Sequence, residues 1–385
     1  MTFYLPEVPT TAVADELIVD LREVGIVEDA LDALGVEHAR KAEVGALDLV
    51  LLQLWYSAEA GTVLVMDVDP VLFELRRRLA AQCGGWNPVL GKNRHLSHQF
   101  GAYPQTQSMA GDFDPEPAAA PDRPEVDPDA GDGVRIGVLD TVLYRHPDLD
   151  GHFETSQSAA VLEDHPTGPI PWEDGHATFV AGLIAAQAPK ATMVVRQVLD
   201  SDGRATTWDT VVGMARFLED GVDIVNFAMG TRSHDGIVPM VVQRAIERLS
   251  PHMLVVAAAG NHGAVPGIRH GITRTSPTWP AALPGVVAVG ATTADGNPAP
   301  YSPDLPWVGC AAVGDRVVST YLKGKVLLRS NDVVEFDGYA TWKGTSFATA
   351  TVSGAIAART VPGEVAPAEA LRRLRAEGTV VRGLG

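Results

Sequence analysis

The chain has 385 residues, which is enough for one large domain and a smaller one. Hydrophobic residues make up 46% and charged residues 20% of it, as expected for a globular protein with a sizeable core. A formal net charge of −18 argues against nucleic acid or an anionic membrane surface as a partner.

Targeting and redox features favour a cytoplasmic location. No run of about 18 apolar residues predicts a membrane span. The N-terminal residues lack a basic region followed by an apolar run, so we expect no signal peptide. The two cysteines, Cys83 and Cys310, lie far apart, which excludes a disulfide framework although not a single bridge. We expect both thiols to be reduced.

Residues 1–110 are predicted to form a small α/β domain. Apolar patterns predict strands at 16–21, 47–54 and 62–67, and helices at 26–34 and 71–80. A further strand near Val89 and Leu90 would give a split β-α-β unit with ferredoxin-like topology. From Gly91 to Ala110 the pattern fades into a polar, mixed stretch.

Residues 111–132 are predicted to be an extended linker. They hold eight acidic residues, five prolines and one arginine, a composition that cannot pack a core. A second domain is then expected over residues 133–385.

In that second domain, apolar strands alternate with helical segments. Strands are predicted at 134–140, 191–198, 224–228, 254–259 and 286–291, and helices at 177–186, 207–220 and 238–249. This alternation predicts an α/β fold, with a mostly parallel sheet and helices on both faces. Functional sites of such sheets lie beyond the carboxyl ends of the strands, where Asp140, Asn226 and Asn261 are expected to converge.

Four residues have the side chains that acyl transfer needs. Ser346 opens a helix, where free N–H groups and the helix dipole favour an oxyanion product. His176 would take the serine proton, Asp140 would orient the imidazole, and the Asn261 amide would help to bind the oxyanion. Taken singly, each residue also fits a structural role as a helix cap, a turn residue or a hydrogen-bonded histidine.

The residues around these four positions form motifs that occur in a fixed order. They are Asp140-Thr141, Gly175–Gly182, Val255–Asn261 and Gly344–Thr349. Together they resemble the subtilisin-like serine proteases, over about residues 133–365, and the order Asp, His, Ser is that of this family. The resemblance implies a serine endopeptidase of subtilisin-like fold with the four roles given above.

The same resemblance implies where a substrate lies. Two segments would line the substrate cleft: Ala228, Met229, Gly230 and Ala258, Ala259, Gly260. The family binds a peptide or protein substrate as an extended strand against such edges. Neither segment holds an acidic residue, which favours a small or apolar specificity residue over a basic one.

The family often carries a small α/β prodomain that inhibits the site through its C-terminal tail. Residues 1–110 have a comparable size, order and position, and residues 91–110 would be the tail. We therefore expect the chain's own N-terminal domain to act as an inhibitor. A docking or dimerisation domain is the alternative.

Three positions depart from the family pattern. Val142 and Ala177 replace glycines, and Ala350 replaces a proline. These departures keep two alternatives open: a catalytically silent peptide-binding protein on the same fold, and an esterase or ligase with the same triad. No cofactor is expected. Calcium binding is common in the family, but the sequence places no calcium site.

Overall fold

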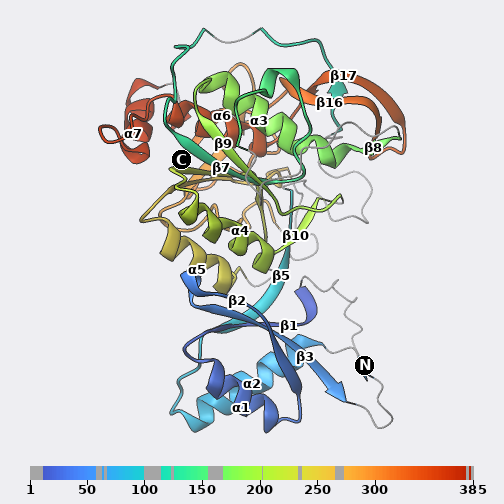
Figure 1. The fold of residues 1–385 in the computed structure, drawn as a ribbon, viewed down its shortest axis with the longest axis vertical. Helices are drawn as coiled ribbons and strands as arrows, with labels where there is room; N and C mark the ends of the chain where they lie inside the picture. Colours follow the sequence, from blue (N-terminus) through green and yellow to red (C-terminus); the bar gives the residue numbers. More distant parts are fainter. Residues whose placement is uncertain are drawn as a thin grey trace.

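A computed structural model describes residues 12–57, 63–64, 67–98, 114–122, 125–154, 168–201, 203–232, 236–264, 273–378 and 381–382. A small N-terminal domain and a larger domain are stacked along the long axis of the molecule (Figure 1). In these ranges no helix combines the length and the apolar character needed to cross a bilayer.

The N-terminal domain is a split β-α-β unit. Its antiparallel sheet has the order β5-β1-β3-β2, built from β1 (Ala12–Asp20), β2 (Glu37–Val44), β3 (Leu49–Ser57) and β5 (Leu90–His98). The short β4 (Val63–Leu64) pairs with β3. The helices are α1 (Val24–Asp32) and α2 (Val68–Gln82). This strand order is the ferredoxin-like topology that the sequence predicted.

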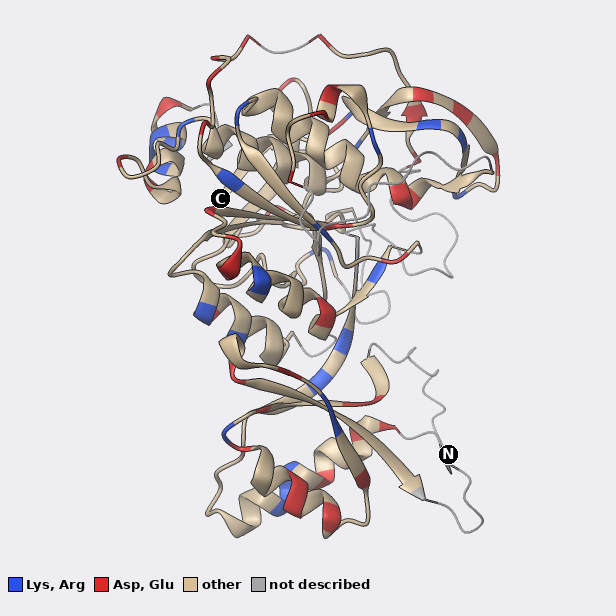
Figure 2. Cartoon of the chain, viewed as in Figure 1, with Lys and Arg blue, Asp and Glu red and all other residues tan. Residues whose placement is uncertain are grey.

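Two strands of this domain were missed by the sequence analysis. β2 was not predicted, because none of its residues is buried and its sequence lacks an apolar face. β5 was expected only near Val89 and Leu90, yet it continues to His98 through basic and polar residues (Figure 2). Strand pairing therefore extends into a stretch whose hydrophobic pattern had faded. Of the strand expected at 62–67, Val63 and Leu64 form β4, whereas residues 62, 65 and 66 lie outside the described residues.

The two faces of the small sheet pack against different partners. Leu17 and Val19 of β1 lie in a core with α1 and α2, whereas Ile18 between them packs against the larger domain. Successive side chains of a strand point to opposite faces, so one strand serves both cores. The larger domain meets this sheet with α4 (Thr207–Glu219) and α5 (Met240–Leu249).

The larger domain is built on a seven-stranded sheet of order β18-β15-β14-β13-β11-β7-β9. Its strands are β7 (Arg135–Asp140), β9 (Thr192–Gln197), β11 (Ile224–Phe227), β13 (Leu254–Ala258), β14 (Val287–Thr292), β15 (Cys310–Val313) and β18 (Val381–Arg382). All neighbours are parallel except β15 and β18.

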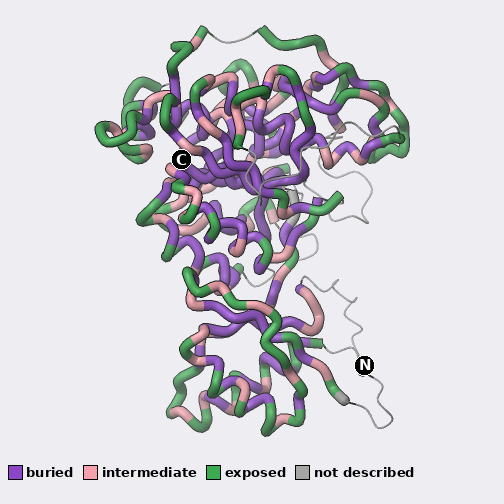
Figure 3. The backbone as a smooth tube through the Cα atoms, in the orientation of Figure 1, coloured by how far each residue is buried: buried purple, intermediate pink, exposed green. Residues whose placement is uncertain are grey.

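Helices cover both faces of this sheet. α3 (His176–Gln187), α6 (Thr345–Ala357) and α7 (Pro367–Glu377) pack on one face, and α4 and α5 on the other (Figure 1). The buried backbone runs through the centre of the domain between these layers (Figure 3). The predicted α/β fold is confirmed.

A third sheet has the order β6-β17-β16-β8. It combines β6 (Glu116–Pro117), β8 (Ile170–Pro171), β16 (Val317–Leu327) and β17 (Val333–Trp342). The β16–β17 hairpin was not predicted from the sequence. β6 belongs to the stretch expected to be a linker, and it pairs with Ala340 and Thr341 of β17. This segment therefore lies against the strand that leads toward Ser346.

Candidate active site

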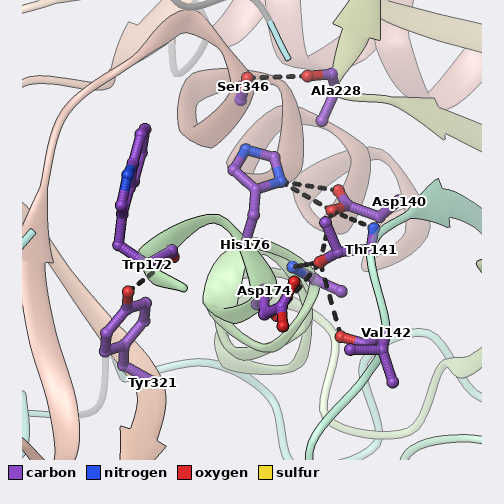
Figure 4. Close-up of polar contacts among 10 residues, drawn as sticks. Asp140, Thr141, Val142, Trp172, Asp174, His176, Ala228, Tyr321 and Ser346 are labelled. Carbon is purple, nitrogen blue, oxygen red and sulfur yellow. Dashed lines mark hydrogen bonds and ion pairs between the residues drawn. The ribbon is translucent and has the colours of Figure 1, made fainter. Parts of the chain in front are cut away.

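Asp140 and His176 are in direct contact. Asp140 ends β7 and His176 opens α3, and His176 Nδ1 lies 2.8 Å from both carboxylate oxygens (Figure 4). Neither side chain is exposed to solvent. A carboxylate can only accept, so Nδ1 carries a proton, and in the neutral ring Nε2 is then the free base.

Thr141 ties the end of β7 to the start of α3. Its N–H donates to Asp140 Oδ1 at 2.7 Å, and its hydroxyl accepts from the Ala177 N–H at 3.1 Å. The same hydroxyl lies 3.2 Å from the carbonyl oxygen of Asp174, to which it donates. Thr141 thus links the Asp140 carboxylate to the backbone on both sides of His176.

The turn before His176 is packed tightly by an aromatic ring. A Cβ on Gly175 would lie 2.2 Å from Cε2 of Tyr321, so only glycine fits there. The Tyr321 hydroxyl donates to the carbonyl oxygen of Trp172 at 2.7 Å, at the start of the same turn. This packing sets the position from which His176 enters α3.

The imidazole also contacts the helix that carries Ser346. Its ring centroid lies 5.4 Å from that of Phe347 and 5.8 Å from that of Trp342. Phe347 follows Ser346 in the first turn of α6. The first turn of α6 therefore lies beside the imidazole.

Ser346 is 3% exposed, and its hydroxyl binds a backbone carbonyl. Its Oγ lies 2.8 Å from the carbonyl oxygen of Ala228, so the hydroxyl is the donor (Figure 4). Because a hydroxyl has one proton, Ser346 does not donate it to His176 in this arrangement. Ala228 lies between β11 and β12 (Met229–Gly230).

Asn261 is fixed against the start of α6. Its Oδ1 accepts from the Thr345 N–H at 2.9 Å and from the Thr345 hydroxyl at 3.0 Å. Gly260 before it has φ of +105°, a conformation that L side chains rarely adopt, and its N–H donates to the Thr345 hydroxyl at 3.1 Å. Because Oδ1 accepts both hydrogen bonds from Thr345, the amide nitrogen of Asn261 points away from Thr345. Its two N–H groups can therefore donate to another acceptor.

The two segments expected to line the cleft follow β11 and β13. Met229 and Gly230 form β12, and both residues are buried. Ala258 ends β13 and is followed by Ala259 and Gly260, all of them buried. Asn226, also expected at this edge, accepts a hydrogen bond from Ser353 of α6 at 3.1 Å and so lies within the sheet–helix packing.

A strand of the N-terminal domain occupies the edge formed by β12. β5 pairs antiparallel with β12, with Ser97 opposite Gly230 and His98 opposite Met229. On its other side β5 pairs antiparallel with β10 (Arg204–Thr206), with Leu96 opposite Ala205. The sequence analysis missed β10, and no apolar alternation marks either this strand or the far end of β5.

The three residues that depart from the family pattern are buried without disturbing the Asp140–His176 contact. Ala177 and Ala350 are fully buried and Val142 is 7% exposed, and all three lie in the core between the sheet and α3 and α6. The backbone N–H of Ala177 still reaches Thr141.

The described residues contain no group of three or more His, Cys, Asp or Glu side chains placed to hold a metal ion. Cys83 and Cys310 are both free thiols.

Comparisons with known proteins agree on one family. Residues 131–370 match the sequence profile of the subtilase family. Subtilisin BL of Lederbergia lenta is 32% identical over 236 residues, which cover 59% of this chain and 76% of that protein. The thermostable alkaline protease of Halalkalibacterium halodurans is 30% identical over 236 residues, which cover 59% of this chain. The match spans 56% of that relative's length, so the chain covers little more than half of it.

Two solved structures are similar as well. A lanthipeptide protease is 24% identical with a TM-score of 0.47, and the match covers 63% of this chain and 75% of that one. The prenylagaramide maturation protease PagA is 23% identical with a TM-score of 0.47, and the match covers 60% of this chain and 76% of that one.

Proposed function

Because the chain belongs to the subtilase family, we propose that it is a serine endopeptidase that hydrolyses peptide bonds in peptides or proteins. The observation that carries the proposal is the 2.8 Å contact of His176 Nδ1 with Asp140, beside the helix turn that bears Ser346. A nucleophile, a base and an orienting carboxylate then lie in one buried site.

The proposed chemistry starts with the serine proton. When the Ser346 hydroxyl turns from the Ala228 carbonyl to His176 Nε2, the imidazole takes its proton as Oγ attacks the scissile carbonyl. Asp140 stabilises the imidazolium that forms, and His176 then gives the proton to the leaving amine. Water hydrolyses the acyl-enzyme by the same steps in reverse order.

The oxyanion of the tetrahedral intermediate needs hydrogen-bond donors. The Asn261 amide and the Ser346 backbone N–H at the start of α6 would supply them. The hydrogen bonds from Thr345 to Asn261 Oδ1, at 2.9 and 3.0 Å, support this role because they leave the amide N–H groups for the oxyanion.

We propose that a substrate binds in the place that β5 takes in this structure. β5 runs between β10 and β12 and is antiparallel to both. An extended peptide in the same register would reach the Ala228 carbonyl beside Ser346. Residues Ala228–Gly230 and Ala258–Gly260 are the proposed walls of that position.

The N-terminal domain would then restrain the enzyme by occupying this place. It is held by more than strand pairing: Asn93 Oδ1 accepts from the Thr207 hydroxyl at 3.0 Å and from the Trp208 N–H at 2.9 Å. Arg244 of α5 pairs with the buried Asp20 at 2.8 Å. These contacts support an inhibitory role for the domain over that of a separate docking module.

Labelling with a fluorophosphonate probe tests the peptidase proposal directly. The full-length chain should become covalently labelled at Ser346, and the Ser346→Ala variant should not. Equal labelling of both proteins, or none of the wild type under any condition that releases β5, would exclude a triad-dependent hydrolase. We also propose a cytoplasmic location for the protein, which cell fractionation would test.

A further inference from the structure

Among the residues that the structure describes, two buried polar atoms beside the proposed substrate position have no hydrogen-bond partner. They are His262 Nδ1 and Thr278 Oγ1, and both residues are fully buried. A Cβ built on Gly260 would lie 2.8 Å from the first atom and 2.9 Å from the second. The two atoms thus converge at Gly260, the residue before Asn261. A buried polar atom without a partner costs stability, so such a pair calls for an explanation.

The protonation of His262 follows from its other nitrogen. Nε2 lies 2.9 Å from the carbonyl oxygen of Ser276, which can only accept, so Nε2 carries the proton. Burial, with a smaller effect of the Arg232 charge, lowers the pKa of His262 to about 3 against the opposing hydrogen bond to Ser276, so the ring stays neutral. Nδ1 is therefore an acceptor, while the Thr278 hydroxyl beside it is able to donate.

Each residue of this pair is joined through the backbone to one of the two proposed walls of the substrate position. Thr231, which follows β12, exchanges backbone hydrogen bonds with Trp279 at 2.9 and 2.8 Å. Thr278 precedes Trp279 and is thereby joined to the β12 wall. His262 follows Asn261 and is thereby joined to the wall of Ala258–Gly260. The acceptor and the donor lie where the two walls meet.

The register of β5 indicates which substrate residue lies nearest. Ser97 is opposite Gly230 and His98 is opposite Met229. In a substrate strand bound like β5, the next residue would be opposite Ala228, whose carbonyl contacts Ser346. That residue would carry the scissile carbonyl. In the sequence of this chain it is Gln99, which lies outside the described residues.

We propose that His262 and Thr278 select a carboxamide side chain at this substrate position, so that the enzyme cleaves after glutamine or asparagine. The inference rests on the proposed peptidase function. The amide NH₂ would donate to His262 Nδ1, and the amide oxygen would accept from the Thr278 hydroxyl. Both buried atoms are then satisfied by one planar group.

Other side chains satisfy the pair less well. A methionine of similar length leaves both atoms unpaired. A glutamate carboxylate has no proton for His262 Nδ1 and would bury its charge. This specificity differs from the small or apolar residue that the wall sequences favoured. Sites built to hydrogen-bond a substrate discriminate strongly against analogues that lack the bonding groups.

The test uses the full-length chain and a series of peptides, acetyl-Leu-Ser-His-X-aminomethylcoumarin, with X as Gln, Met or Glu. We expect kcat/KM for Gln to exceed that for Met by about tenfold or more. Thr278→Val should remove most of this preference by lowering the Gln value, and Thr278→Ser, which keeps the hydroxyl, should retain it. An equal or higher value for Met, or an unchanged Gln-to-Met ratio in Thr278→Val, would overturn the inference.

Two controls separate this inference from the proposed function and from a folding defect. Ser346-dependent fluorophosphonate labelling without a Gln preference rejects the carboxamide site alone, whereas the absence of all labelling, also under conditions that release β5, rejects the peptidase. Thermal unfolding of Thr278→Val should give an unchanged or higher Tm, because valine has the same shape and leaves no unpaired hydroxyl. A lower Tm would mean that the hydroxyl has a structural partner, such as a buried water, and would also overturn the inference.

Discussion

The hydroxyl of Ser346 donates to the carbonyl oxygen of Ala228 at a distance of 2.8 Å. Ala228 directly precedes β12, the strand against which β5 of the N-terminal domain is paired. The proposed nucleophile and the tail of the proposed inhibitor therefore meet the same edge of the larger domain. The proposed catalysis and the proposed restraint therefore depend on this one edge.

Replacing Asp140 by Asn should leave the fold intact and abolish most of the activity. The amide would favour the wrong tautomer of His176, because its NH₂ group donates where the carboxylate accepts. A loss of about 10⁴ in kcat is expected, the size measured for this change in another serine protease. Kinetics on a peptide substrate, with circular dichroism as the folding control, check it. A loss below tenfold would speak against the 2.8 Å contact as the orienting one.

Asn261 offers a pair of variants that separates two roles. Asn261→Asp keeps the Oδ1 acceptor for the Thr345 N–H but removes the amide donor, and Asn261→Ala removes both. Both should lower kcat by about 100- to 1,000-fold, the size measured for such a donor in subtilisin, with little change in KM. Only the Ala variant should lose both hydrogen bonds from Thr345. Full activity in the Asp variant would show that the amide does not stabilise the oxyanion.

Gly175→Ala should destabilise the larger domain, because its Cβ would lie 2.2 Å from the Tyr321 ring. Overpacking of this kind costs about 1–3 kcal/mol of unfolding free energy. Urea unfolding measures it. Adding Tyr321→Leu should recover part of that cost, so a double-mutant cycle should give a non-additive sum. Additive losses would mean that the two residues do not press on each other.

Weakening the contact of Asn93 with α4 should release the N-terminal domain. Asn93→Ala removes the acceptor for Thr207 and Trp208 at the start of that helix, which costs about 0.5–2 kcal/mol. The rate of Ser346 labelling should rise several-fold. Arg77→Ala serves as the control, because Arg77 pairs only with Glu74 of the same helix among the contacts described and is well exposed. An equal rise in both variants would point to general destabilisation of the domain.

Acid should loosen the same interface. The hydrogen bond from Arg22, with Arg244 adding to it, holds the pKa of Asp20 well below its usual range, against the opposing effect of burial. A lowered folded-state pKa stabilises the folded chain above the unfolded pKa of about 4, and this stability is lost as the pH falls below that value. Asp20→Asn should therefore show a smaller fall in stability between pH 6 and pH 3, by roughly 1 kcal/mol or more. Parallel pH curves for the two proteins would contradict this.

The sequence determined the family, the α/β class and the identity of four polar residues at element boundaries. Such information is local: Asp140 ends an apolar strand, and Ser346 stands between glycine and a run of small residues, so short windows suffice to find them. The structure brings Asp140 and His176 into contact, because a helix that connects two parallel strands begins at the edge where the first strand ends.

The tertiary structure alone decided what lies against that edge. β5 is polar along most of its length. Its partners in the larger domain are backbone groups of β10, β12 and the first turn of α4. Pairing of this kind leaves no hydrophobic periodicity in the sequence. The acceptor of the Ser346 hydroxyl is likewise the carbonyl oxygen of Ala228, which lies between β11 and β12 and is 118 residues away in the sequence. His262 and Thr278 can form one proposed site only because the fold, with its Thr231–Trp279 pairing, places both side chains beside Gly260. Unpaired buried atoms are a property of the packed chain, and no residue type reveals them in advance.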